Sequence, residues 1–239
     1  MIPSIEREDA MRNAVADVMG NVRTVTVSRG EVLERVFLLR DSSCELPMEH
    51  LVLEAGSRAD VTVIVMPGVS CDIRLAVDIA GENADCSVKG IYLCPDNEKV
   101  HVAVDMNHLV PRCSSRQLFK GIAGGSSSVD FYGKIIVAAD AQKTEAYQEN
   151  HSLLLSDKAS VNTRPQLEIY ADDVKCSHGA TIGRLNEEEQ FYMRSRGITL
   201  REARVLQMIS FLSPVFHGMP ESAVREEIEE AVEKAVRQM

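Results

Sequence analysis

A degenerate strand–turn–strand unit recurs along this chain of 239 residues. The run Ala55-Gly-Ser-Arg-Ala-Asp-Val-Thr-Val returns as Ala80-Gly-Glu-Asn-Ala-Asp-Cys-Ser-Val. Looser copies are Ala123-Gly-Gly-Ser-Ser-Ser-Val-Asp-Phe and Leu155-Ser-Asp-Lys-Ala-Ser-Val-Asn-Thr. Recurrence at about 25 to 45 residues in a strand-rich chain favours coils stacked as a β-helix or solenoid. A jelly roll or a sandwich also uses many short strands, so both stay open.

Short runs rich in Val, Ile, Leu and Thr alternate with small and polar residues from Val22 to about Ile182. Val22-Arg-Thr-Val-Thr-Val and Gly133-Lys-Ile-Ile-Val are examples, and apolar side chains at every second position are typical of strands. We therefore predict a mainly β protein whose β-helix core occupies residues 22–184.

The sequence before and just after this core has a helical texture. Residues 5–20 can form a short helix inside an N-terminal helical segment, residues 1–21. Behind the core, Asn186 can cap a helix with three glutamates in its first turn, and Gly197 is a C-terminal stop. We expect residues 185–239 to form a C-terminal helical domain.

Two further helices are predicted in this C-terminal domain. Thr199 with Glu202 is a capping box, and the helix that it opens should end near Pro214. Pro220 can start the last helix. Its apolar stripe consists of Val224, Ile228, Ala231, Val232 and Ala235. The stripe can pack against the protein's own β-core or face a partner, and the sequence leaves both open.

Composition excludes several classes of protein. The formal charge is −10 and no Lys/Arg cluster stands out, which argues against binding to nucleic acid or an anionic membrane. No apolar run approaches the roughly 18 residues of a spanning helix. The charged N-terminus does not resemble a signal peptide, so we expect a cytoplasmic protein. Its six cysteines are irregularly spaced, and those at Cys71, Cys86 and Cys94 read as buried apolar residues.

Cys176 and His178 are the strongest candidates for chemistry. They lie two residues apart at what reads as a strand, so their side chains should share one face. A thiolate and an imidazole suit zinc or an iron–sulfur species. Because Val174 and Ile182 have the same parity, this face can equally be core. Two ligands fall short of the four that a closed site needs, so others must come from elsewhere in the fold or from a second chain. His151 lies about one repeat earlier, and it is a further candidate because stacking of coils can bring it near Cys176.

Other chemistries find less support. There is no phosphate-binding loop of the GxxxxGK[ST] type, so we expect no bound nucleotide, and there is no GxSxG elbow. Asp172 and Asp173 are neighbours that should point to opposite faces, which suits a turn better than a glycosidase pair. The alternatives are a β-solenoid enzyme acting on carbohydrate or acyl substrates, and a purely architectural module.

The segment Thr163-Arg-Pro-Gln-Leu-Glu-Ile-Tyr-Ala-Asp-Asp-Val-Lys-Cys-Ser-His-Gly-Ala-Thr resembles the hallmark segment of the SufB/SufD family, in particular its SufD branch. The following Gln190-Phe-Tyr-Met-Arg-Ser-Arg-Gly-Ile, with Glu202-Ala203, is similar to the helical segment that comes next in that family. The resemblance is specific from about Tyr147 to Phe211 and looser over the β-region.

The resemblance implies a cytosolic, non-catalytic scaffold subunit for iron–sulfur cluster assembly, with a β-helix core and a C-terminal helical domain. It implies two partners: a SufC-type ATPase on the C-terminal helices, and a SufB-type chain or a second copy on the β-helix. In the family, the thiol and imidazole of the Cys-Ser-His triplet lie near the subunit interface where a transient cluster is proposed to form. Those positions correspond to Cys176 and His178.

Two departures favour the SufD branch. The family's SufB members carry a cysteine in the run that corresponds to Gln148-Glu-Asn-His-Ser-Leu-Leu, where this chain has Asn150. They also have a glutamate where this chain has Gly179. The chain is short for the family, and we expect it to be a minimal form that lacks most of the family's N-terminal region. We therefore expect half of a cluster site, completed across a subunit boundary.

Overall fold

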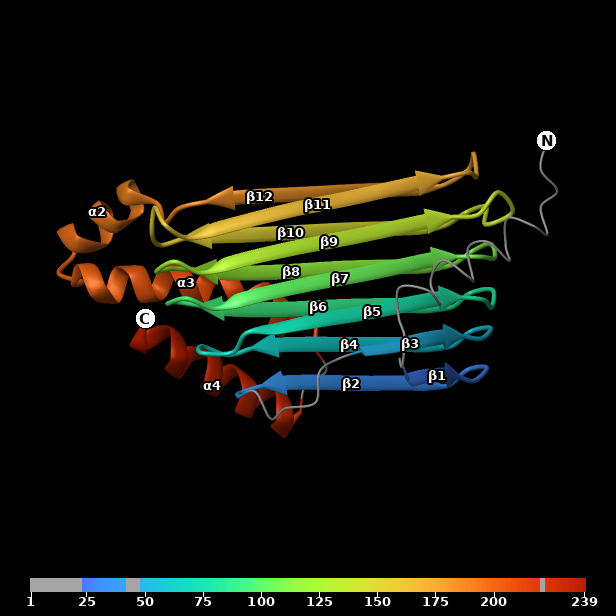
Figure 1. Ribbon diagram of the computed structural model, residues 1–239, viewed down its shortest axis with the longest axis horizontal. Coiled ribbons are helices and arrows are strands. Elements are labelled where there is room, and N and C mark those ends of the chain that lie inside the picture. The colour runs from blue at the N-terminus through green and yellow to red at the C-terminus, as the bar shows by residue number, and fades with distance from the viewer. Residues whose placement is uncertain (1–22, 42–47, 220–221) are drawn as a thin grey trace.

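The computed structural model describes residues 23–41, 48–219 and 222–239 (Figure 1). These residues form twelve strands in two six-stranded sheets, followed by three helices. The helix expected at residues 5–20 and Cys44 lie outside the described residues.

The odd-numbered strands form sheet A and the even-numbered strands form sheet B. Sheet A consists of β1 (Arg23–Val27), β3 (Met48–Leu53), β5 (Cys71–Ile79), β7 (Lys99–His108), β9 (Ser128–Val137) and β11 (Ser160–Ile169). Sheet B consists of β2 (Val32–Leu39), β4 (Arg58–Val65), β6 (Asp85–Cys94), β8 (Ser114–Ala123), β10 (Glu145–Leu154) and β12 (Lys175–Gly183).

Every strand pairs in parallel with the strand two places along the chain, so each odd–even pair of strands makes one coil of a flattened β-solenoid. The register steps by 26 residues from Arg23 to Glu49 and by 32 from Ser128 to Ser160. Apolar side chains at alternate positions fill the space between the sheets, with Val63, Val104 and Phe131 almost inaccessible to solvent. The predicted mainly β solenoid is confirmed.

The repeat units found in the sequence do not all occupy the same place in a coil. The copies at Ala55 and Ala80 form turns that lead from sheet A to sheet B, after β3 and β5. Those at Ala123 and Leu155 lead from sheet B to sheet A, after β8 and β10, at the opposite end of the solenoid. The wide spacing between the second and third copies therefore spans one and a half coils. Both kinds of turn need small and polar residues, which is why they look alike.

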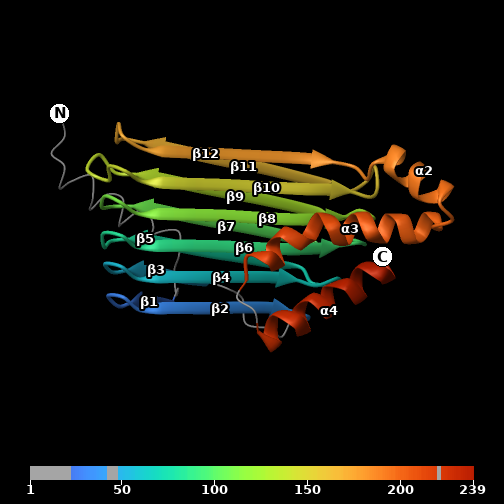
Figure 2. The same cartoon turned by 180° about the vertical axis from the view of Figure 1, so that it is seen from behind.

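The three helices are α2 (Glu187–Ser195), α3 (Leu200–His217) and α4 (Ala223–Gln238). Figure 2 shows α3 and α4 lying against the outer face of sheet B. A second apolar cluster joins them to that face, with Ile91 and Leu93 of β6 packed against Leu212 and Val232. Of the predicted stripe, Ile228, Val232 and Ala235 are buried there and Val224 is half exposed. The stripe thus packs on the protein's own β-core.

The predicted caps are present. Asn186 Oδ1 accepts hydrogen bonds from the backbone N–H groups of Glu188 and Glu189, and Gly197 has a φ of +88°, the left-handed conformation of a C-terminal stop. The hydroxyl of Thr199 accepts the N–H of Glu202, whose carboxylate binds Arg237.

The expected end of the second helix near Pro214 is wrong, because α3 continues through it to His217. A proline leaves the carbonyl four residues earlier without its helical donor. The hydroxyl of Ser213 donates to this carbonyl, that of Ser210, at 2.9 Å. The last helix begins at Ala223, and the hydroxyl of Ser222 caps it by accepting the N–H of Arg225; Pro220, its predicted start, lies outside the described residues. The domain boundary at residues 184/185 stays a prediction.

Candidate functional site

Cys176 and His178 lie on β12, the last strand of sheet B. Their register partners on β10 are Ala146 and Gln148, which are fully buried between the two sheets. Because side chains at paired positions of parallel strands share a face, Cys176 and His178 are on the inner face of the solenoid. The Cα atoms of residues two apart on a strand are about 6.6 Å apart, so the two groups can act on one small species.

The last coil is open. Within the described residues, β12 pairs only with β10, and β11 pairs only with β9. The inner face of β9 is fully buried at Phe131, whereas its register partner on β11, Thr163, is partly accessible. His178 is exposed at this end, and Cys176 is half buried and packs against the main apolar cluster. The site is therefore reachable from outside through the unpaired end of the solenoid.

Burial raises the pKa of the Cys176 thiol above its ordinary value, and a hydrogen bond with the backbone of Ala146 opposes that shift. A raised pKa keeps the group as a neutral thiol at pH 7. A cation or a second chain that contributes positive charge would favour the thiolate. Cys176 therefore needs positive charge nearby to become a reactive thiolate.

Two amide side chains continue the register row of His178 across the neighbouring strands of sheet B. Gln148 on β10 and Gln117 on β8 occupy the same register row as His178, and both are buried. The Nε2 of Gln148 donates to Oε1 of Gln117 at 3.2 Å. Within the described residues, the Oε1 of Gln148 and the Nε2 of Gln117 have no hydrogen-bond partner. Alternation alone would place apolar side chains here, so these amides are functional candidates that sequence reasoning missed.

Neighbouring inner positions are polar too. Asn150 and Ser152 follow Gln148 on the inner face of β10, and Ser152 Oγ lies 2.6 Å from the Tyr92 hydroxyl. The Nδ2 of Asn150 has no hydrogen-bond partner in the part of the chain that the structure describes. Asn150 belongs to the run in which a cysteine would have marked SufB, and here it contributes an amide rather than a thiol. The interior thus changes from apolar in the early coils to polar beneath the open end.

His151 does not belong to this site. It lies on the outer face of β10, where its Nδ1 is 2.7 Å from Thr181 Oγ1. Cys176 is opposite Ala146, five residues away along β10, and on the other face. The suggestion that stacking brings His151 to Cys176 is therefore wrong, because the parity of the strand directs the two side chains apart.

The remaining described cysteines behave as apolar residues. Cys86 and Cys94 are buried, and burial raises their pKa far above the ordinary value. Cys71 is half buried, and desolvation raises its pKa to about 11. Among the described residues, no three His, Cys, Asp or Glu side chains converge as a metal site. Cys176 and His178 therefore stay two candidate ligands at the open coil, with no cluster of three such side chains in the described residues.

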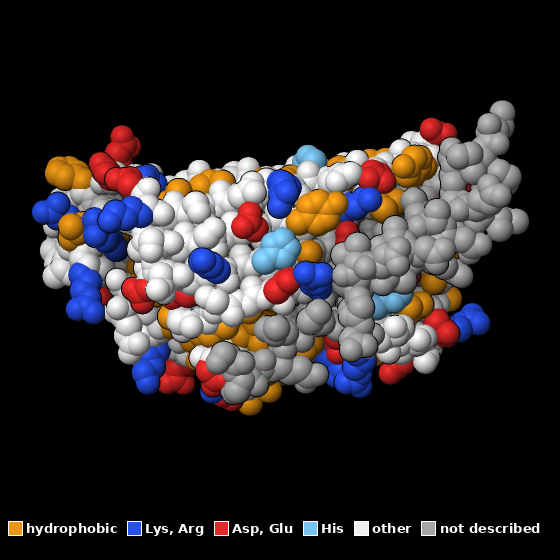
Figure 3. Space-filling view, viewed as in Figure 1, with side chains coloured by type: hydrophobic (Ala, Val, Ile, Leu, Met, Phe, Trp, Pro, Cys, Tyr) orange, Lys and Arg blue, Asp and Glu red, His pale blue; other side chains and the backbone are white. Residues whose placement is uncertain are grey.

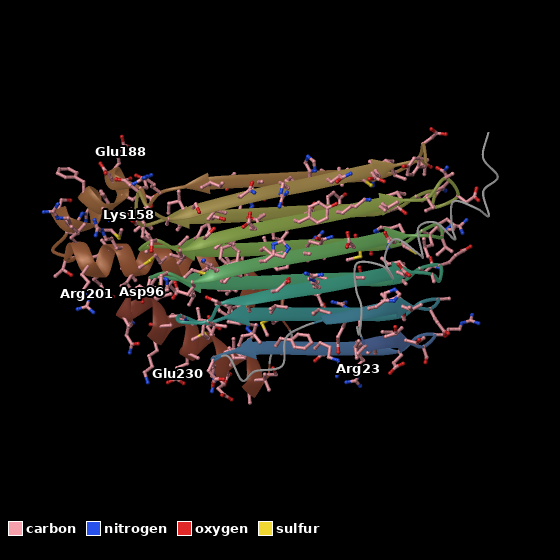
Figure 4. The ribbon with its side chains drawn as sticks, in the orientation of Figure 1. Arg23, Asp96, Lys158, Glu188, Arg201 and Glu230 are labelled. Carbon is pink, nitrogen blue, oxygen red and sulfur yellow. The ribbon has the colours of Figure 1, made fainter. Side chains whose placement is uncertain are left out.

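The helical region carries the second candidate surface. A groove of about 860 Å³ runs between α2 and α3, lined by residues that include Tyr192, Leu206 and Phe211. Phe191 and Tyr192 on α2 are 73% and 60% exposed. Figure 4 shows Glu188 and Arg201 of these helices at the same end of the molecule as Asp96 and Lys158 of the sheet-B-to-sheet-A turns. Large exposed aromatic side chains beside a groove indicate a protein-binding surface.

Comparison with known proteins agrees on one family. The family profile described as "SUF system FeS cluster assembly, SufBD core domain" matches residues 10–211. The chain is 31% identical over 207 residues to the iron-sulfur cluster assembly protein SufD of Escherichia coli, which covers 86% of this chain and 49% of the relative. It is 34% identical over 211 residues to the chloroplastic protein ABCI7 of Arabidopsis thaliana, covering 86% of this chain and 44% of that one.

A third relative is the SufBD family protein slr0076 of Synechocystis, at 40% identity over 132 residues, or 55% of this chain and 29% of the relative. The chain thus spans about half the length, or less, of these curated relatives. Among the helices of the described residues, none has the length and apolar character needed to cross a bilayer.

Proposed function

Since this chain belongs to the SufBD core family of the SUF iron–sulfur cluster assembly system, we propose that it is a SufD-like scaffold subunit. It would not catalyse a reaction itself. It would contribute Cys176 and His178 to a transient iron or iron–sulfur cluster held at a subunit interface. Iron and sulfide are here the cargo of the complex.

The open last coil is the observation that carries this proposal. An unpaired edge strand with free backbone groups is a template for pairing with another chain. β12 has such an edge within the described residues, and it also bears both ligands. A SufB-type subunit, or a second copy of this chain, would cover the edge and bring the missing ligands in the same step. Dimerisation and completion of the site would be one event.

The helical region supports the second partner. Tyr192 lines the groove between α2 and α3, and its neighbour Phe191 on α2 is also largely exposed in the described part of the chain. We propose that a SufC-type ATPase docks there. The helices pack on sheet B through a shared apolar cluster, so movement of the ATPase could be transmitted to the solenoid.

The free thiols of the described cysteines fit a reducing compartment, and we propose the cytoplasm. A β-solenoid enzyme finds no support in the geometry. Asp172 and Asp173, the adjacent carboxylates, are exposed in the turn between β11 and β12.

Reconstitution of cluster assembly tests the function. The chain is combined with a SufB-type subunit, a SufC-type ATPase, ATP, iron and a sulfide source, and cluster formation is followed by absorption. Cys176→Ala and His178→Ala should each lower the yield severalfold while circular dichroism stays unchanged. Cys71→Ala and His151→Ala are the matched controls, and they should behave as wild type. Wild-type yield in both site variants would refute the role of the pair.

A further inference from the structure

The outer face of sheet A carries a small pocket far from the Cys176 site. It has a volume of about 220 Å³ and is lined by Arg74, Leu75, His101, Ala103, Asp105, Tyr132 and Arg164. Figure 3 views this face and shows acidic, basic and histidine side chains interspersed over the middle of the sheet. None of these residues belongs to the proposed cluster site, which lies on the inner face of sheet B.

The strand register explains the hollow. Arg74, Ala103, Tyr132 and Arg164 form one row across β5, β7, β9 and β11. Ala103, the small member of the row, has larger neighbours about 4.8 Å away across the sheet and about 6.6 Å away along its own strand. The latter are His101 and Asp105. A methyl group surrounded by four larger side chains leaves a depression with an apolar floor.

The charges around this depression are incompletely matched. Arg74 is bound to Asp72, with Nη2 to Oδ2 at 2.8 Å. Arg164, by contrast, has no hydrogen bond or ion pair among the interactions of the described residues. Its row partner Tyr132 donates to Gln166, which leaves the ring available as a wall. One guanidinium therefore faces the pocket without a protein anion.

Asp105 faces the same pocket without a hydrogen-bond donor in the described part of the chain. Burial raises its pKa, and the charge of Lys134 opposes this only in part, since Lys134 forms its ion pair with Glu168 at 3.0 Å. A half-buried carboxylate without a donor costs free energy unless a ligand supplies one. Register places Asp105 two strands away from Arg164 and two residues further along the strand direction, and the two side chains form no ion pair in the described part of the chain.

We propose that this pocket binds a small zwitterion, specifically a free α-amino acid with a short side chain. Its carboxylate would pair with Arg164, beside His101, and its ammonium group would donate to Asp105. The side chain would lie on Ala103 against the ring of Tyr132. A zwitterion satisfies one free cation and one free anion together, which neither a simple anion nor a metal ion can do.

Calorimetric titration of the full chain with L-alanine tests the proposal. Propanoate, which lacks the ammonium group, and ethylamine, which lacks the carboxylate, are the comparison ligands. We expect saturable binding of L-alanine and at least about tenfold weaker binding of either analogue, the loss typical of one charge-assisted hydrogen bond. Absence of saturable L-alanine binding would overturn the proposal. Equal affinity for propanoate would also overturn it, by showing a plain anion site.

Substitutions in the pocket test whether L-alanine binds there. Asp105→Asn and Arg164→Gln should each weaken L-alanine binding about tenfold, and Ala103→Leu should abolish it by filling the hollow. Glu34→Gln, an exposed carboxylate on β2 of the other sheet, is the control and should bind as wild type. If Ala103→Leu unfolds the chain, as judged by circular dichroism, the two charge variants decide. Wild-type affinity in both would place the ligand elsewhere and refute the site.

Discussion

Lys89 of β6 donates a hydrogen bond to the carbonyl oxygen of Gly218, the residue that caps the C-terminus of α3. A Cβ atom at position 218 would come 2.6 Å from Cε of Lys89, so a side chain there would displace the end of this lysine. The ammonium group also lies 3.7 Å from Asp60 of β4. Lys89 therefore links the C-terminal end of α3 to the outer face of sheet B. Its positive charge is also favourable at the negative end of the helix dipole.

Replacement of Lys89 by methionine should release that end of α3. The Gly218 carbonyl would lose its donor and the buried Asp60 would keep only Arg58, so we expect a loss of about 1–3 kcal/mol in the free energy of unfolding. Urea denaturation measures the loss, and hydrogen exchange should rise in the last turn of α3. Lys158→Met, in an exposed turn, is the control. Unchanged exchange in α3 would contradict the fastening role.

Acid should destabilise the solenoid through His108. This imidazole is fully buried, with Nε2 2.8 Å from Ser115 Oγ, and burial lowers its pKa to about 4. The unfolded chain binds a proton near pH 6.5 while the folded chain does not, so stability is full above pH 6.5 and falls as the pH drops toward 4.

The expected loss from His108 between pH 6.5 and 5 is about 2 kcal/mol, at about 1.4 kcal/mol per pH unit. Urea titrations at pH 7.5 and 5 should show a smaller drop for His108→Asn than for wild type. His151→Asn, on the outer face, should keep the wild-type drop. An equal drop in all three proteins would show that His108 does not govern acid sensitivity.

The buried amides beneath His178 should be replaceable only as a pair. Gln148→Leu alone leaves Gln117 without its one partner, and we expect a cost of about 1–3 kcal/mol. The Gln117→Leu/Gln148→Leu double variant removes both polar groups, so it should be more stable than either single variant. Denaturation curves of the three proteins check this, with Gln166→Leu on the outer face as control. A double variant weaker than both singles would contradict it.

A proline at position 180 should prevent association through β12 and leave folding unaffected. The N–H of Lys175 donates to the carbonyl oxygen of Thr144, which directly precedes β10. Along β12, every second residue therefore points its N–H toward β10, and the residues between them point theirs away from it. The N–H of Ala180 therefore faces the free edge of β12, where a proline costs no internal hydrogen bond.

We expect Ala180→Pro to keep the wild-type circular dichroism spectrum and to lose association with a SufB-type chain or with itself, measured by analytical ultracentrifugation. Thr181→Pro is the matched control, since its N–H faces β10 and its loss should destabilise the fold. Undiminished association of Ala180→Pro would show that the partner does not pair with this edge.

Truncation of the exposed aromatic pair should weaken ATPase binding without unfolding the chain. Phe191→Ala with Tyr192→Ala should lower affinity for a SufC-type ATPase at least about tenfold, because exposed aromatic anchors dominate interface energy. Stability should change by less than about 0.5 kcal/mol, since both side chains face solvent. Val32→Ala, equally exposed on β2, serves as control in the same binding titration. Wild-type affinity of the double variant would move the docking site elsewhere.

Local sequence determined the elements of this protein. Alternating apolar residues and turn signals predict the strands, and Asn186 and Thr199 predict helix starts that the structure confirms. These signals act within a few residues and need no tertiary partner. The predicted helix end at Pro214 was wrong for the same reason. A proline by itself tends to stop a helix, but the hydroxyl of Ser213 and packing on sheet B allow α3 to continue.

Only the tertiary structure decided which residues of different coils meet. The parity of Cys176 and His178 follows from the sequence, but their position on an open coil depends on how many coils stack before them. The amides of Gln117 and Gln148 meet because the register between β8 and β10 aligns them, 31 residues apart. The same holds for Ala103 and the larger side chains that surround it. Turn lengths vary from coil to coil, so spacing in the sequence cannot fix this register, whereas burial of the inner face does.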